Sequence, residues 1–125
     1  MKKLLIAVAI IALSGCQAMQ QRHVNDSPAQ FYRPDGASES WKITGTLTLD
    51  IDRMWGNHKR QLNVNINGQP VIEGFLSPMY SGELSGQYEN KRVDSICSGE
   101  QKNPNWIDVR CLILIDNQRA ATLSF

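Results

Sequence analysis

The side chains that could support catalysis are few in this chain of 125 residues. The two histidines are His23 and His58, and no serine lies in a G-x-S-x-G turn. A serine or cysteine hydrolase would need His58 as general base, with Asp50 or Asp52 orienting its ring. Because no nucleophile is placed by a recognisable turn, we interpret His58 as a solvent-facing loop histidine. We predict that the protein is not an enzyme.

Patterns of metal ligands are also missing. Asp50-x-Asp52 begins like a calcium-binding loop, but the following ligand and the Gly-x₅-Glu sequence are absent. A charged strand end is the simpler interpretation. The sequence contains no cluster of His and Cys at zinc-binding spacing. We therefore predict neither a metal nor a cofactor.

The most distinctive local feature is the segment Arg53-Met54-Trp55-Gly56-Asn57-His58-Lys59-Arg60. It combines a large aromatic residue and a methionine with residues that are or can be cationic, namely Arg53, His58, Lys59 and Arg60. Trp and Arg dominate binding hot spots, so at a hairpin tip this segment could bind a protein partner or an anionic polymer. In the alternative interpretation, Trp55 closes the end of a barrel and the charges solvate a loop.

The first sixteen residues have the organisation of an export signal. Lys2 and Lys3 precede an apolar run from Leu4 to Leu13, which is shorter than the about 20 residues of a permanent membrane helix. The sequence Leu13-Ser14-Gly15-Cys16 follows at once and resembles the lipobox of bacterial lipoproteins. An ordinary secretory signal with an accidental cysteine is the alternative.

The resemblance implies cleavage before Cys16, a diacylglyceryl group on its thiol, and acyl chains such as palmitate that hold the protein on a membrane of the cell envelope. In enteric bacteria the residue after the cysteine sorts such proteins, and Gln17 favours the outer membrane. The periplasmic and surface faces of that membrane both stay open.

The lipobox accounts for one of the three cysteines. Cys97 and Cys111 then form a pair, which we expect to be a disulfide in an oxidising envelope. Closing a loop of about 15 residues contributes roughly 3 kcal/mol in the chain-entropy model. The spacing is unlike the CxxC of redox pairs, so we predict a structural disulfide.

Removing the signal peptide, residues 1–15, leaves enough chain for one small domain. Residues 16–40 show no strand or helix periodicity, and we interpret them as a lipidated N-terminus and flexible linker, holding a β domain over 41–125 roughly 25 to 30 Å from the membrane. Alternatively, Phe31, Tyr32 and Pro34 dock on the domain. Without Lys2 and Lys3, 11 basic residues face 12 acidic ones, so no basic field exists to attract nucleic acid.

From Trp41 onward, apolar and polar residues alternate as in half-buried strands, most clearly over 41–52 and 62–66. Asn67-Gly68 predicts a hairpin turn. Because Ile72 must share a face with Val64, the loop should hold an odd number of residues, which favours three or five over two. Two further hairpins are expected about Glu89-Asn90 and Asn117-Gln118.

Pairing Cys97 with Cys111 also sets Val93 opposite Ile115 and Ile96 opposite Leu112, so the disulfide and the apolar pattern require one register. The strand over 106–115 is apolar on both faces and should be central. No stretch of ten or more residues after the signal has helical periodicity. The expected fold is all-β, a small antiparallel meander of seven or eight strands, closed as a barrel or folded as a sandwich.

These features predict a membrane-anchored envelope lipoprotein whose β domain has a non-enzymatic binding or structural role. Its partners would be the membrane, through the lipid, and an envelope protein or cell-wall component. One alternative is an inhibitor of a cell-wall enzyme, because the layout is similar to that of the membrane-bound lysozyme inhibitors, although their acidic, serine-bearing motif is missing. Another is an accessory subunit of a secretion or adhesion assembly.

Overall fold

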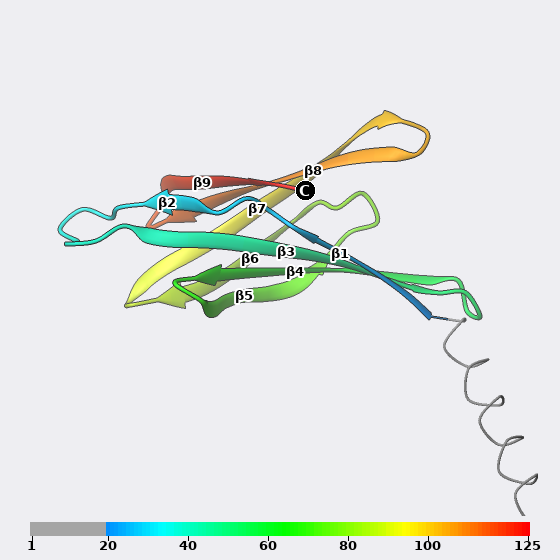
Figure 1. The fold of residues 1–125 in the computed structure, drawn as a ribbon, viewed down its shortest axis with the longest axis horizontal. Coiled ribbons are helices and arrows are strands. Elements are labelled where there is room, and N and C mark those ends of the chain that lie inside the picture. The colour runs from blue at the N-terminus through cyan, green and yellow to red at the C-terminus, as the bar shows by residue number, and fades with distance from the viewer. Residues whose placement is uncertain (1–19) are drawn as a thin grey trace, which may run out of the picture.

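The computed structural model describes residues 20–125, which form nine β-strands (Figure 1). In chain order these are β1 (Gln20–Asp26), β2 (Gln30–Tyr32), β3 (Trp41–Asp52), β4 (Asn57–Ile66), β5 (Gln69–Leu76), β6 (Gly82–Tyr88), β7 (Lys91–Asn103), β8 (Trp106–Ile115) and β9 (Gln118–Ser124). Within these residues, no helix is long and apolar enough to cross a membrane. The predicted signal peptide and Cys16 lie outside the described residues.

Two antiparallel sheets face each other as a sandwich. One sheet has the order β1-β3-β4-β5, with β2 also paired to β3, and the other has the order β6-β7-β8-β9. Alternate residues of the facing strands fill the space between the sheets, and the fully buried aliphatic side chains are Ile43, Leu62, Val64, Ile66, Ile72, Val93, Ile113 and Leu123. The all-β antiparallel prediction is confirmed, and the sandwich is the form adopted.

The segment interpreted as a flexible linker contributes two strands. β1 pairs with residues 46–52 of β3, and β2 pairs with residues 41–43 of the same strand. The side chains of residues 22–26 are all exposed, so no burial pattern marks β1 in the sequence. Backbone hydrogen bonds hold it on the edge of β3 instead. The linker prediction is therefore wrong for residues 20–32, and these strands raise the number to nine.

β2 and Pro34 dock on the rest of the domain. Tyr32 packs against the core and Pro34 is buried, whereas Phe31 is 67% exposed. The Gln30 side-chain amide bridges to the second sheet, where it accepts a hydrogen bond from Thr122 N at 2.9 Å and donates one to Thr122 O. Because Thr122 belongs to β9, this amide covers part of the edge of that strand.

The sheets also meet closely along β5 and β6. A Cβ atom on Gly86 would overlap the backbone carbonyl of Val71. Glycine is thus required at position 86 for this approach, because every other residue carries a Cβ.

Each of three hairpins turns through two residues that both have positive φ, as in type I′ turns. The predicted longer loop at Asn67-Gly68 is wrong, because Ile66 pairs directly with Gln69. The register then shifts, leaving Val71 as an extra residue in β5, and Val64 faces Ile72 as required. A β-bulge therefore supplies the odd residue that the prediction assigned to the loop.

The other two turns follow the same geometry. The β6–β7 turn is Glu89-Asn90, as predicted. The β8–β9 turn is Asp116-Asn117 and not Asn117-Gln118, since Ile115 pairs with Gln118. Here too a bulge follows, with Ala120 as the extra residue.

The predicted register between β7 and β8 is confirmed. Val93 lies opposite Ile115, Ile96 opposite Leu112 and Cys97 opposite Cys111. The two cysteines form a disulfide between buried positions, and β8 lies inside its sheet, between β7 and β9.

Replacing both cysteines in the Cys97→Ala, Cys111→Ala variant should lower the free energy of unfolding by about 3 kcal/mol, because the covalent loop constrains the unfolded chain. Urea denaturation of the oxidised proteins measures the difference. A change below about 1 kcal/mol would contradict this contribution of the covalent loop.

Candidate binding surface at the hairpin end

The segment singled out in the sequence is a short, ordered turn followed by the start of a strand. Asp52 pairs with Asn57, so the β3–β4 turn consists of the four residues 53–56. The Asp52 carboxylate accepts hydrogen bonds from Met54 N at 3.0 Å and Trp55 N at 3.4 Å, which fixes the turn from inside. Gly56 supplies the positive φ, 68°, that closes it.

The apolar side chains of this turn lie in solvent. Trp55 is 74% exposed and Met54 is 61% exposed. The interpretation of Trp55 as a plug over the end of a barrel is therefore wrong. The indole is available for binding and is carried by a turn whose backbone is already hydrogen-bonded.

The cationic residues of this segment differ in exposure. Arg53 in the turn and His58 and Lys59 in the strand are exposed. Arg60 shares the face of buried Leu62, and its guanidinium carbon lies 5.0 Å from the centre of the Tyr80 ring. Arg60 Nε is buried without a hydrogen-bond partner among the described residues.

The structure thus brings four of the five predicted binding residues to the surface, namely Arg53, Trp55, His58 and Lys59. The fifth, Arg60, packs by a cation–π contact and is only partly exposed. Its charge still contributes to the potential at this end of the domain, but its guanidinium faces the protein.

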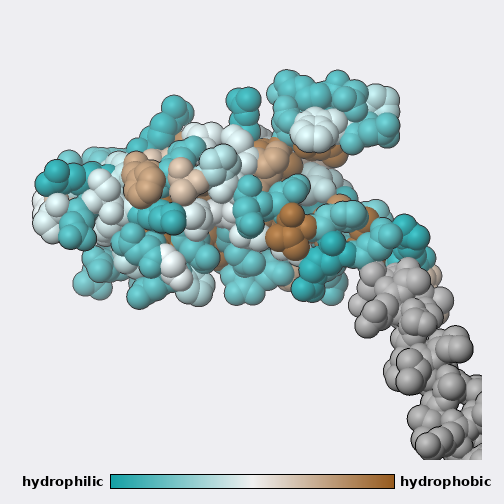
Figure 2. All heavy atoms as spheres, viewed as in Figure 1, coloured by the Kyte–Doolittle hydropathy of each residue, from teal (hydrophilic) through white to brown (hydrophobic). Residues whose placement is uncertain are grey.

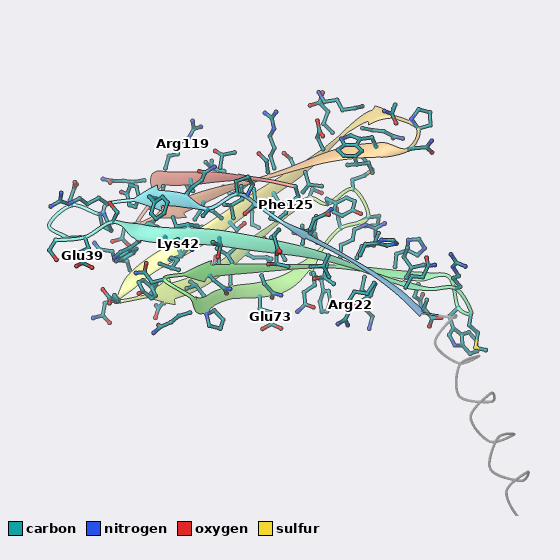
Figure 3. The ribbon with its side chains drawn as sticks, viewed as in Figure 1. Arg22, Glu39, Lys42, Glu73, Arg119 and Phe125 are labelled. Carbon is teal, nitrogen blue, oxygen red and sulfur yellow. A yellow bond between two sulfur atoms is a disulfide. The ribbon has the colours of Figure 1, made fainter. Side chains whose placement is uncertain are left out.

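β1 adds a cation that sequence reasoning missed. Arg22 Nε donates to Asp50 Oδ1 at 2.7 Å, and this hydrogen bond, together with the charge of Asp50, raises the pKa of the guanidinium. The Asp50 carboxylate therefore accepts a hydrogen bond from Arg22, and the Asp52 carboxylate accepts hydrogen bonds from the turn amides. These partners take the place of His58, which either carboxylate would orient in a hydrolase. Figure 3 labels Arg22 at this end of the domain and Glu39 and Lys42 at the other.

A second hairpin tip projects at the same end. The β7–β8 tip and the β3–β4 turn diverge at the right of Figure 1, and Figure 2 shows apolar surface between these two projections. Trp106, at the start of β8, is 57% exposed, and its Nε1 donates to Asp108. From its sequence pattern, Trp106 is predicted only to begin a strand, although the preceding turn residues Asn103-Pro104-Asn105 are a signal for a hairpin tip.

A shallow depression lies at the opposite end. The loop over 34–40 forms it with Trp41, Asn67, Glu89 and Lys91, and it encloses about 530 Å³. Its charged side chains are mostly exposed and therefore solvated. It has no exposed aromatic ring comparable to Trp55.

No family model, curated protein or solved structure matches this chain. The role of the hairpin end is therefore inferred from its geometry and chemistry.

The Trp55→Ala variant should change the free energy of unfolding by less than about 0.5 kcal/mol, because the indole is exposed. Trp41→Ala is the contrasting variant: Trp41 is buried and packs edge-on against Tyr88, so its loss should cost about 3 to 5 kcal/mol. Urea denaturation measures both. A large loss of stability for Trp55→Ala would mean that Trp55 is part of the core.

Proposed function

We propose that this protein is a lipid-anchored protein of the bacterial cell envelope that binds another envelope component, without catalysis, through the β3–β4 turn. The proposed anchor is a lipid on Cys16, and Gln17 favours the outer membrane. The observation that carries the binding role is Trp55, held in solvent on a fixed turn.

Two properties of the turn support a binding role. A fixed backbone loses little conformational entropy when a partner binds, so more of the contact energy appears as affinity. Exposed Trp55 and Met54 offer apolar area, while Arg53 and Lys59 offer charge beside it. This mixture is typical of binding hot spots and of surfaces that contact anionic partners.

The anchoring part of the proposal predicts that Cys16→Ser abolishes incorporation of labelled palmitate. The thioether and the amine at position 16 carry the lipid. The Cys16→Ser substitution removes the thiol and blocks processing, so neither group can be acylated. The matched control is the Cys97→Ser, Cys111→Ser variant, which should keep its label. A labelled Cys16→Ser protein would contradict the lipid anchor.

The binding part is tested with a photo-crosslinking amino acid placed at position 54 in intact cells. Trp55→Ala should strongly reduce the crosslinked product, because it removes the apolar anchor beside the probe. Phe31→Ala is the matched control, since Phe31 is 67% exposed on β2, which pairs with residues 41–43 at the opposite end of β3 from the turn.

Equal crosslinking in both variants would contradict a role for Trp55. Mass spectrometry of the product crosslinked to the wild-type turn distinguishes the possible partners: a lipid, a cell-wall enzyme, or a subunit of a secretion or adhesion assembly.

A further inference from the structure

The pairing of β1 places the start of the described chain beside the β3–β4 turn. Gln20 lies opposite Asp52, the residue directly before the turn. Cys16 precedes Gln20 by four residues, and consecutive Cα atoms are about 3.8 Å apart, so its Cα lies within about 15 Å of the Gln20 Cα. A lipid on Cys16 therefore brings the turn close to the bilayer, in place of the longer spacing expected from a flexible linker.

The direction of β1 also places the end of the domain with the β3–β4 turn nearer the bilayer than the opposite end. β1 and β3 are antiparallel, and β3 runs for twelve residues from Trp41 to Asp52, about 40 Å at the usual rise of a strand. The loop with Asp35 and Glu39 lies at the far end, together with Glu89. An anchor at residue 16 thus holds these acidic residues away from the lipid.

The charges beside the β3–β4 turn suit an anionic bilayer surface. Residues 20–23 and 49–60 contain four Arg or Lys and two Asp, whereas the remaining described residues contain seven Arg or Lys and ten Asp or Glu. Both Asp side chains are engaged, Asp50 with Arg22 and Asp52 with the turn amides. Exposed Arg53 and Lys59 keep their charges available for lipid phosphates.

The apolar groups of the turn suit the same surface. Trp is enriched where headgroups meet acyl chains, because its ring is apolar and its N–H can still hydrogen-bond. Trp55 and Met54 are the exposed apolar residues at the tip, and long cationic side chains beside them can reach back to the headgroups.

We infer that the β3–β4 turn docks on the bilayer that holds the lipidated Cys16, with Trp55 and Met54 among the headgroups and Arg53 and Lys59 against anionic lipid phosphates. This inference rests on the proposed lipid anchor and names the bilayer surface as the partner of the proposed binding site. The docked turn fixes the orientation of the sandwich, with the β7–β8 tip free of the membrane.

The test uses the full lipidated protein in vesicles of phosphatidylethanolamine and phosphatidylglycerol with brominated acyl chains, which quench the fluorescence of tryptophans in contact with lipid. Quenching is expected in the wild type, lost in Trp55→Phe and kept in Trp106→Phe. Trp41 is buried and should contribute none. Quenching that is lost in Trp106→Phe and kept in Trp55→Phe would overturn the assignment of the β3–β4 turn.

Charge variants test the second half of the contact. The Arg53→Gln, Lys59→Gln variant should lower the ratio of docked to undocked protein by about 30-fold, since each cation near an anionic surface strengthens binding. The matched control is Lys42→Gln, Arg119→Gln, which removes one lysine and one arginine from the far end of the domain (Figure 3) and should leave quenching unchanged. An equal loss in both variants would overturn a local contact.

Failure of the inference and failure of the anchor are distinguished by the palmitate label. A labelled wild-type protein without quenching overturns membrane docking and leaves the lipid-anchored binding protein in place. The same conclusion follows if position 54 crosslinks to a protein rather than to lipid. A wild-type protein without palmitate on Cys16 overturns both proposals.

Discussion

Hydrogen bonding along both edges of β3 is the constraint on which the arrangement of the hairpin end depends. β4 pairs with one edge of this strand from Ile43 to Asp52, and β1 and β2 pair with the other. An uncovered edge of this length would present unpaired backbone groups, so β1 stabilises β3 without burying a side-chain face. The same pairing fixes the start of the described chain beside the β3–β4 turn, which joins the anchoring and binding parts of the proposed function.

A second constraint is that β5 and β9 must each turn one face toward the core, while the length of a tight turn fixes which residues lie on that face. Two-residue turns with positive φ at both positions match the twist of the strands they connect. In the β4–β5 hairpin this turn would point Ile72 away from the core, and the extra residue Val71 reverses that outcome. Ala120 does the same for β9, where Ala121 and Leu123 are buried. Turn geometry and core packing are thus satisfied separately, a few residues apart.

At the β3–β4 turn, the side chains of Arg53, Met54 and Trp55 are exposed and are not used for packing. Trp41 and Tyr88 pack together at the other end, whereas Trp55 extends from a turn that Asp52 holds by its backbone amides. Arg60 shows the contrast within one strand, since its guanidinium lies over Tyr80 and faces the protein. The exposed groups at the turn can therefore change without loss of the fold, which is a condition for a surface selected for binding.

The all-β class, the β7–β8 register and the disulfide could be predicted from the sequence, because alternating apolar residues and the Cys97–Cys111 pair reflect contacts through side-chain identity. The sequence also contains the lipobox resemblance on which the proposed anchor rests. The pairing of residues 20–32 with the sheet, the two bulges, the exposure of Trp55 and the inward orientation of Arg60 became evident in the folded structure. Backbone pairing of exposed strands leaves no apolar pattern in the sequence, and the exposure of a turn residue depends on strands distant in the chain.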